Sequence, residues 1–195
     1  MDLVFATANT HKLQEVRSLL PPQLHVLSLD DIGFTETLPE TGETIPENSL
    51  EKAEYLFARC RLPCFSEDAG LEIEALQGRP GVHSAHYAGS RDAQENIRKV
   101  LEEMRGVENR KARFVAVFTL IIDGKADQFT GIVTGKIAEQ PVGGAGFGYD
   151  PIFIPDGYTS TFAELGDKVK AAVSHRSRGF HLLISHLENF LHNGG

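Results

Sequence analysis

Residues 3–12 read Leu3-Val4-Phe5-Ala6-Thr7-Ala8-Asn9-Thr10-His11-Lys12, and this stretch indicates the fold class. Its apolar first part predicts a short buried strand, and the polar residues after it predict a loop. Apolar residues then recur at helical spacing from Leu13 to Leu20, until Pro21-Pro22 ends the pattern. A strand that leads through a loop into a helix is typical of α/β proteins.

The rest of the chain continues this alternation. Thr44 and Glu47 have capping-box spacing at the start of a second predicted helix, and a short strand over 64–66 follows it and ends at Glu67-Asp68. A helix over 93–104 precedes an antiparallel ribbon over 113–122 and 128–137, which turns at Asp123-Gly124. A terminal helix begins after Ser174 as its N-cap. We therefore predict a mixed α/β protein around a sheet, with a cleft between two lobes.

The composition restricts the classes of protein. With 195 residues, 41% of them hydrophobic, the chain is expected to form one domain over 1–195. A net charge of -8 argues against a nucleic-acid partner. No signal peptide or membrane-spanning run is evident, so we expect a cytoplasmic protein without a membrane partner. The two cysteines, Cys60 and Cys64, are interpreted as free thiols.

Two groups of residues suggest a phosphate and metal site. The loop from Thr7 to Lys12 lies at a predicted helix N-terminus, where amide groups and a lysine favour anions, although such a loop is also typical of a plain connection. Carboxylates at 40, 43, 67 and 68 suit a hard cation such as Mg²⁺. The alternative is that Glu40 and Glu43 are solvated and Asp68 caps a turn.

Two further groups suggest recognition of a flat ligand. Residues 143–151 combine four glycines with Phe147 and Tyr149, which allows close backbone approach and ring stacking but also suits a structural turn. A cationic cluster stands out in this acidic protein, formed by Lys168, Lys170 and the run 174–178. It either binds an anion or a keto oxygen, or forms a solvated basic face.

Together these groups match a family pattern. Over nearly its whole length the sequence resembles the inosine triphosphate pyrophosphatases, which act on non-canonical purine nucleoside triphosphates. The motifs that carry the resemblance are Thr7-Ala8-Asn9-Thr10-His11-Lys12, Glu40-Thr41-Gly42, Glu47-Asn48, Asp68-Ala69-Gly70-Leu71, Pro80-Gly81-Val82-His83-Ser84-Ala85, Phe147-Gly148-Tyr149-Asp150-Pro151 and Ser174-His175-Arg176.

The resemblance implies a two-lobed α/β fold with a curved central sheet, a homodimer, and Mg²⁺-dependent cleavage of ITP, dITP and XTP to monophosphate and pyrophosphate. Glu40 and Asp68 would hold Mg²⁺, with Asp68 also as general base. The remaining positions would contact the substrate. They are Thr7, Ala8, Asn9, Thr10, His11 and Lys12 with Lys52 for the triphosphate, Phe147 and Asp150 for the base, Lys170, His175 and Arg176 for both, and Ala69, Gly148 and Tyr149 for the substrate in general.

Two positions depart from the family pattern. Glu67 stands where an Asp is common, and Ala69 stands where Ser is frequent. We expect the longer Glu67 to affect the outer shell of the metal and Ala69 to weaken one substrate contact. Two other interpretations remain open. The first is a Maf-type pyrophosphatase that acts on modified pyrimidines or dTTP, but the 147–150 and Ser-His-Arg motifs argue against it. The second is a nucleotide sensor, which would not need the carboxylates of Glu40 and Asp68.

Overall fold

The structure, a computed structural model, describes residues 1–192. Six strands form one mixed sheet in the order β2-β1-β3-β4-β5-β6, with β1 parallel to both β2 and β3 and with β5 antiparallel to β6. The strands are β1 (Asp2–Ala6), β2 (His25–Leu27), β3 (Cys64–Ile73), β4 (Lys111–Ile122), β5 (Lys125–Ile137) and β6 (Phe153–Pro155). The helices are α1 (Thr10–Ser18), α2 (Ile45–Cys60), α3 (Ala93–Glu103), α4 (Phe162–Val173) and α5 (His175–His192), with four short 3₁₀ helices between them.

The chain forms two compact units. Unit 1 contains the described residues 1–68, 116–131 and 176–192, and unit 2 contains 69–115 and 132–175. The long strands β3, β4 and β5 each contribute residues to both units. The prediction of a single domain over 1–195 is compatible with such an internal division but stays a prediction.

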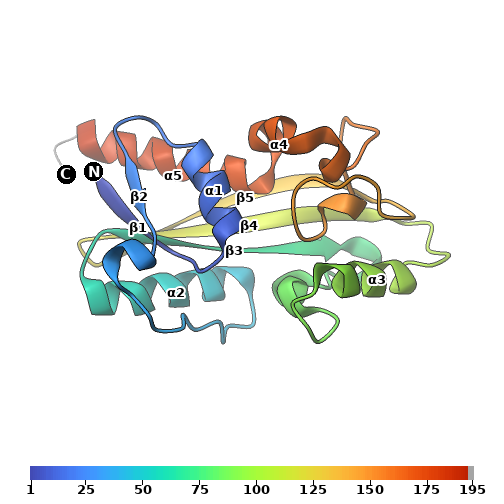
Figure 1. Cartoon of the computed structure of the whole chain (residues 1–195), viewed down its shortest axis with the longest axis horizontal. Helices are drawn as coiled ribbons and strands as arrows, with labels where there is room; N and C mark the ends of the chain where they lie inside the picture. Colours follow the sequence, from blue (N-terminus) through green and yellow to red (C-terminus); the bar gives the residue numbers. More distant parts are fainter. Residues whose placement is uncertain (193–195) are drawn as a thin grey trace. The chain divides into compact units, whose positions relative to one another are not determined.

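In unit 1, helices α2 and α5 cover opposite sides of the strands (Figure 1). Alternation along β3 separates these two layers, because successive side chains of a strand point to opposite faces. Cys64 packs with Ala53 and Leu56 of α2. Phe65, the next residue, stacks on Phe5 with ring centroids 4.5 Å apart and lies 5.9 Å from the ring of Phe180 in α5.

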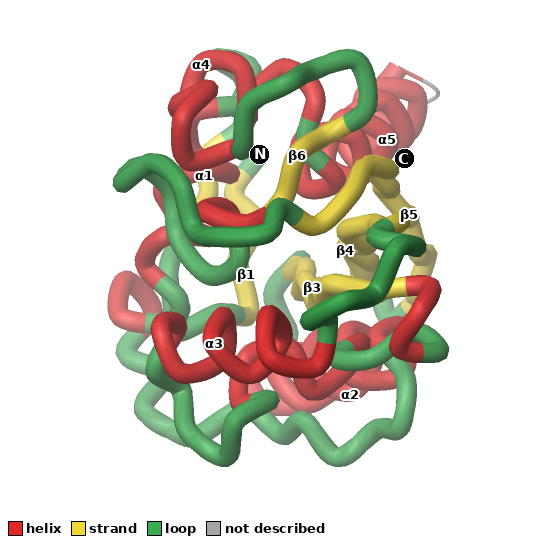
Figure 2. Tube along the Cα trace, turned by 90° about the vertical axis from the view of Figure 1, so that its right-hand side faces the viewer, coloured by secondary structure: helices red, strands yellow, loops and turns green. Residues whose placement is uncertain are grey.

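In unit 2, helices α3 and α4 lie on opposite sides of the strands (Figure 2). The α3 face contributes Ile97 and Val100 to the core. On the other side Phe114 of β4 packs against Phe153 and Phe162, with ring centroids 4.6 and 6.5 Å away. Tyr149 belongs to the same buried cluster, so the glycine-rich segment is attached to the core of this unit.

The structure confirms most predicted elements. Thr44 caps α2 in a capping box with Glu47, α3 begins at Ala93, and Asp123 and Gly124 both have the positive φ that a two-residue hairpin turn requires. Cys60 and Cys64 are free thiols, and burial raises the pKa of Cys64 to about 12. Among the described residues, no helix is long and apolar enough to cross a bilayer.

One predicted boundary is wrong. The strand that begins at Cys64 does not end at Glu67-Asp68 but continues to Ile73, so the acidic pair lies inside β3. Charged residues are rare in buried strands, but both carboxylates here are neutralised by cations, which removes the penalty for continuing the strand.

Gly135 supplies the first test. A Cβ at this buried β5 position would overlap the carbonyl oxygen of Ile154 and lie 2.8 Å from the ring of Phe153. We therefore expect Gly135→Ala to lower the free energy of unfolding by about 1–3 kcal/mol, as overpacking does. Urea denaturation measures this change, with Gly144→Ala as the control, because a Cβ at 144 meets nothing within 4 Å. Equal midpoints for the two variants would contradict the close β5–β6 approach.

Candidate functional site

A buried lysine joins the two carboxylates that were predicted to hold a metal. Lys52 Nζ, on α2, lies 2.9 Å from Glu40 Oε1 and 2.9 Å from Asp68 Oδ1, and donates to the carbonyl of Glu67 at 3.1 Å. The Lys52 side chain is 5% exposed and that of Asp68 is 11% exposed. The interpretation of Asp68 as a turn cap is therefore wrong, because its carboxylate is buried in β3 and paired.

The same contacts decide the protonation of this cluster. Burial is the largest influence on Lys52 and acts to lower its pKa, but Asp68 and Glu40 together raise that pKa above the ordinary lysine value. Burial raises the pKa of Asp68, while Lys52 and Lys12 act in the opposite direction. A carboxylate with a raised pKa is a stronger base than an ordinary aspartate.

Glu67 points to the opposite face of β3 from Asp68, as strand alternation requires. Its Oε2 lies 2.6 Å from Lys12 Nζ, and its Oε1 accepts hydrogen bonds from Arg176 Nε at 3.2 Å and Nη2 at 3.0 Å. Arg176 Nη1 also pairs with Glu15 of α1. Burial tends to lower the pKa of Arg176, but Glu67 and Glu15 raise that pKa above its usual range.

The predicted loop from Thr7 to Lys12 ends earlier than expected, because α1 begins at Thr10, and its own side chains hold this segment. Asn9 caps α1, because its Oδ1 accepts from the backbone N–H of His11 at 3.0 Å and of Lys12 at 3.1 Å. Asn9 N–H in turn donates to Thr7 Oγ1 at 3.1 Å. Burial lowers the pKa of Lys12, with Glu67 acting against that change. Phosphate binding by Thr7, Ala8, Asn9, Thr10, His11 and Lys12 stays a prediction.

Unit 2 contains a buried ion pair of its own. Lys170 Nζ lies 2.7 Å from Asp150 Oδ2, with side chains 6% and 3% exposed, and 4.4 Å from the centroid of the Phe147 ring. Asp150 Oδ2 also accepts the backbone N–H of Phe147 at 2.8 Å. The structure thus brings together Phe147, Asp150 and Lys170, three residues that were predicted to contact the base.

The other predicted contacts of unit 2 differ in exposure. Tyr149 is buried, and Gly148 and Ala69 are partly exposed. His175 is buried and stacks on Phe114, with ring centroids 4.7 Å apart and planes 14° apart. Their contacts with a substrate stay predictions.

The cationic cluster is not a single solvated face. Lys168 is exposed, but Lys170 and Arg176 are buried with carboxylate partners. Sequence reasoning missed Glu15, which pairs with Arg176 across 161 positions of the chain and has no local signal. It also missed α4, for which the capping box of Thr161 and Glu164 was a readable signal.

The donor set of Glu40 and Asp68 fits Mg²⁺ in its chemistry. Among residues 1–192 no group of three or more His, Cys, Asp or Glu side chains is arranged to hold a metal ion. Mg²⁺ commonly takes one or two carboxylates and completes its shell with water and substrate phosphates. The carboxylate oxygens of Glu40 and Asp68, which both lie at the ammonium group of Lys52, are therefore chemically suited to Mg²⁺ that is also bound by phosphate oxygens.

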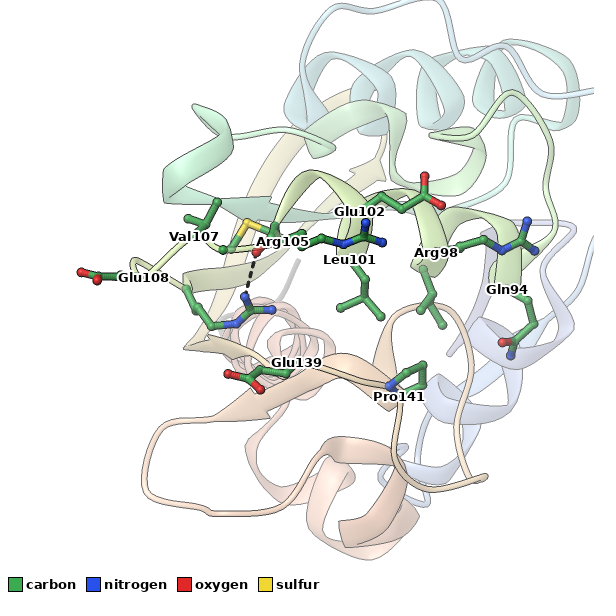
Figure 3. Close-up of a pocket in the computed structure, with 13 residues that line it drawn as sticks. Gln94, Arg98, Leu101, Glu102, Arg105, Val107, Glu108, Glu139 and Pro141 are labelled. Atoms are coloured by element: carbon green, nitrogen blue, oxygen red, sulfur yellow. Dashed lines mark hydrogen bonds between the residues drawn. The ribbon is translucent and has the colours of Figure 1, made fainter.

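A cavity of about 940 Å³ in unit 2 is separate from these residues (Figure 3). Arg98 and Leu101 of α3 line it from one side, and Glu139 and Pro141 line it from the other. None of the predicted site residues contributes to its wall.

Comparison with known proteins identifies relatives over the whole chain. The model of the Ham1 family matches residues 3–186. The dITP/XTP pyrophosphatase of Porphyromonas gingivalis is 47% identical over 97% of this chain and 96% of its own, and that of Bacillus subtilis is 43% identical over 96% and 97%.

Solved structures agree with this relationship. The Ham1 protein of Staphylococcus aureus has a TM-score of 0.89 at 34% identity, over 97% of this chain and 99% of its own. A HAM1 protein from Coxiella burnetii has the same TM-score at 35% identity, with the same coverage. The mixed α/β fold and the family resemblance are confirmed, and this chain belongs to the Ham1 family.

Proposed function

We propose that this protein hydrolyses the non-canonical purine nucleoside triphosphates ITP, dITP and XTP to the monophosphate and pyrophosphate, and so removes them from the nucleotide pool. The observation that carries the proposal is the buried pair of Asp68 and Lys52, which the exposed Glu40 joins through Lys52, in a chain whose nearly full-length relatives are dITP/XTP pyrophosphatases.

The residues of unit 1 suit the triphosphate. Lys12, Lys52 and the loop over 7–12 supply positive charge and donors for phosphate oxygens. Asp68 orients a water molecule and accepts its proton as the water oxygen bonds to the α-phosphorus. The bond from the α-phosphorus to the bridging oxygen breaks, and pyrophosphate leaves with that oxygen. Lys12 stabilises the charge that develops on the leaving group.

Glu40 and Asp68 would hold Mg²⁺ in this proposal, with Lys52 withdrawn from their oxygens toward the phosphates. When bound, Mg²⁺ neutralises phosphate charge and polarises phosphoryl oxygens.

Most of the residues assigned to the base lie in unit 2. Phe147 stacks on its face, and Asp150 binds its edge. Tyr149, Gly148, Ala69 and Lys170 complete the surroundings of the base. His175 and Arg176 select the six-keto group, because a keto oxygen accepts hydrogen bonds whereas the six-amino group of adenine donates them. Adenine would place a donor against a donor, which a buried site rejects strongly.

Further properties of the protein belong to the same proposal. We expect a cytoplasmic homodimer that acts on free nucleotides, without a nucleic-acid or membrane partner. The net charge of -8 supports the choice of small nucleotides over nucleic acid, because phosphate-backbone binding depends on a cationic surface.

The products of the reaction test the function first. With Mg²⁺ present, ITP, dITP and XTP should yield pyrophosphate and monophosphate, while ATP and dTTP should react at least about 100-fold more slowly because they lack a matching six-keto purine edge. Ion chromatography of each reaction separates pyrophosphate from orthophosphate. Orthophosphate as the first product, or preferred cleavage of dTTP, would refute this function.

Asp68→Asn tests the general base. Asparagine keeps an oxygen for Lys52 but cannot accept a proton, so kcat for ITP should fall about 10²–10⁴-fold. The variant should still fold, although with a lower melting temperature, because Glu40 remains as an ionic partner of Lys52. Glu36→Gln is the matched control, because Glu36 also accepts from a cation, Arg59 at 2.7 Å, but lies on the surface of unit 1. Asp68 is not the base if its Asn variant keeps kcat within tenfold of wild type.

Removal of divalent cations tests the metal. Protein treated with EDTA and then freed of it should release pyrophosphate from ITP at least about 100-fold more slowly, since charge on the phosphates would no longer be neutralised. Added Mg²⁺ should restore the rate in wild type, and Glu40→Gln should need a higher Mg²⁺ concentration for half-maximal rate. Full activity without any divalent ion would contradict this assignment.

A further inference from the structure

The motif over 80–85 has no part in the proposed chemistry, although it is one of those that carry the family resemblance. Most of it forms the 3₁₀ helix Gly81–His86. Ser84, which is 8% exposed, is its buried member. Its Oγ accepts the backbone N–H of Leu71 in β3 at 2.9 Å and donates to the carbonyl of Gly81 at 2.6 Å. These two bonds fix Ser84 against the sheet of unit 2.

The carbonyl of Ser84 in turn holds Tyr149. The Tyr149 hydroxyl donates to it at 2.9 Å in a buried hydrogen bond. Burial raises the pKa of Tyr149 above its ordinary value, so the hydroxyl keeps its proton and remains a donor. Because the ring of Tyr149 also belongs to the unit 2 core, both its position and its direction are set.

Tyr149 lies within the segment that carries the base-contacting residues. Asp150 Oδ2 binds both Phe147 N–H and Lys170 Nζ, and a Cβ at Gly146 would overlap that same oxygen. The segment over 146–150 is thus tied together around one carboxylate, which restricts it to move largely as one piece. The Tyr149 hydroxyl bond anchors this piece to the 3₁₀ helix.

We propose that Ser84 is a positioning residue for base recognition, which acts through the hydroxyl of Tyr149 to fix the segment that carries Phe147 and Asp150. This inference rests on the proposed function and adds a specificity role for the motif over 80–85. Ser84 itself touches neither substrate nor reacting atoms in this role.

Tyr149→Phe tests the anchor with the ring kept. The KM for ITP should rise about 3- to 10-fold, as expected for one lost neutral hydrogen bond, with kcat within about twofold. The preference for ITP over ATP should fall by a similar factor, because a displaced Asp150 and Phe147 discriminate less well. Tyr55→Phe is the matched control, since its hydroxyl binds Glu36 on the surface of unit 1. Unchanged KM and preference in Tyr149→Phe would overturn the inference.

Ser84 variants separate positioning from plain stability. Ser84→Ala removes the bonds to Leu71 and Gly81 and should raise KM in the same direction, whereas Ser84→Thr keeps the hydroxyl and should remain near wild type. A lower melting temperature in Ser84→Ala with unchanged KM and preference would show a merely structural role.

A fluorescence measurement, which does not depend on catalysis, tests the anchor separately from the proposed function. The chain contains no Trp, so Phe147→Trp introduces a single indole into the segment, and excitation at the red edge of indole absorption avoids the four tyrosines. Adding Tyr149→Phe should raise the acrylamide quenching constant of this indole at least about twofold, and adding Tyr55→Phe should not. Equal quenching would refute the anchor even if ITP is cleaved. Wild-type failure to cleave ITP would refute only the proposed function.

Discussion

Two adjacent carboxylates inside one buried strand are the constraint on which unit 1 depends. Strand alternation sends Glu67 and Asp68 to opposite faces of β3, and the two side chains pair with different cations. An unpaired buried charge costs several kcal/mol, and each face must therefore supply its own partner. Lys52 of α2 does so on one face, and Lys12 and Arg176 do so on the other. The acidic pair thus fixes the positions of α2 on one face, and of α1 and α5 on the other, relative to β3.

Unit 2 also neutralises a buried carboxylate, that of Asp150, with a buried lysine. Asp150 and Lys170 are both nearly inaccessible, and the ammonium group lies over the Phe147 ring, where the negative face of the π system stabilises it further. The carboxylate also accepts a backbone N–H, so its charge organises the segment over 146–150 as well as neutralising the lysine. The Asp150 carboxylate therefore both neutralises Lys170 and fixes the conformation of the segment over 146–150.

The sequence predicted what depends on local pattern. The capping box at Thr44, the hairpin turn at Asp123-Gly124 and the period of α3 each rest on neighbours within a few residues, and the structure confirms them. The end of β3 was misjudged because the cations that allow buried carboxylates come from distant positions. Lys52 entered only through the family resemblance, and the partnership of Arg176 with Glu15 has no local trace at all. The sequence therefore predicts most of the secondary structure, but not the ion pairs between residues that are distant in the chain.

The position of Lys52 bears on how such a site works with a metal. Its ammonium group contacts the same Glu40 and Asp68 oxygens that the proposed function assigns to Mg²⁺. Mg²⁺ held by Glu40 and Asp68 would compete with the ammonium group of Lys52, which lies 2.9 Å from one oxygen of each, for the electron pairs of these carboxylates. Under the proposed function, the two tasks assigned to Lys52 would therefore belong to different states of the protein. In the structure Lys52 neutralises two carboxylates, and a metal held by those carboxylates would leave the charge of Lys52 for the phosphates of the substrate.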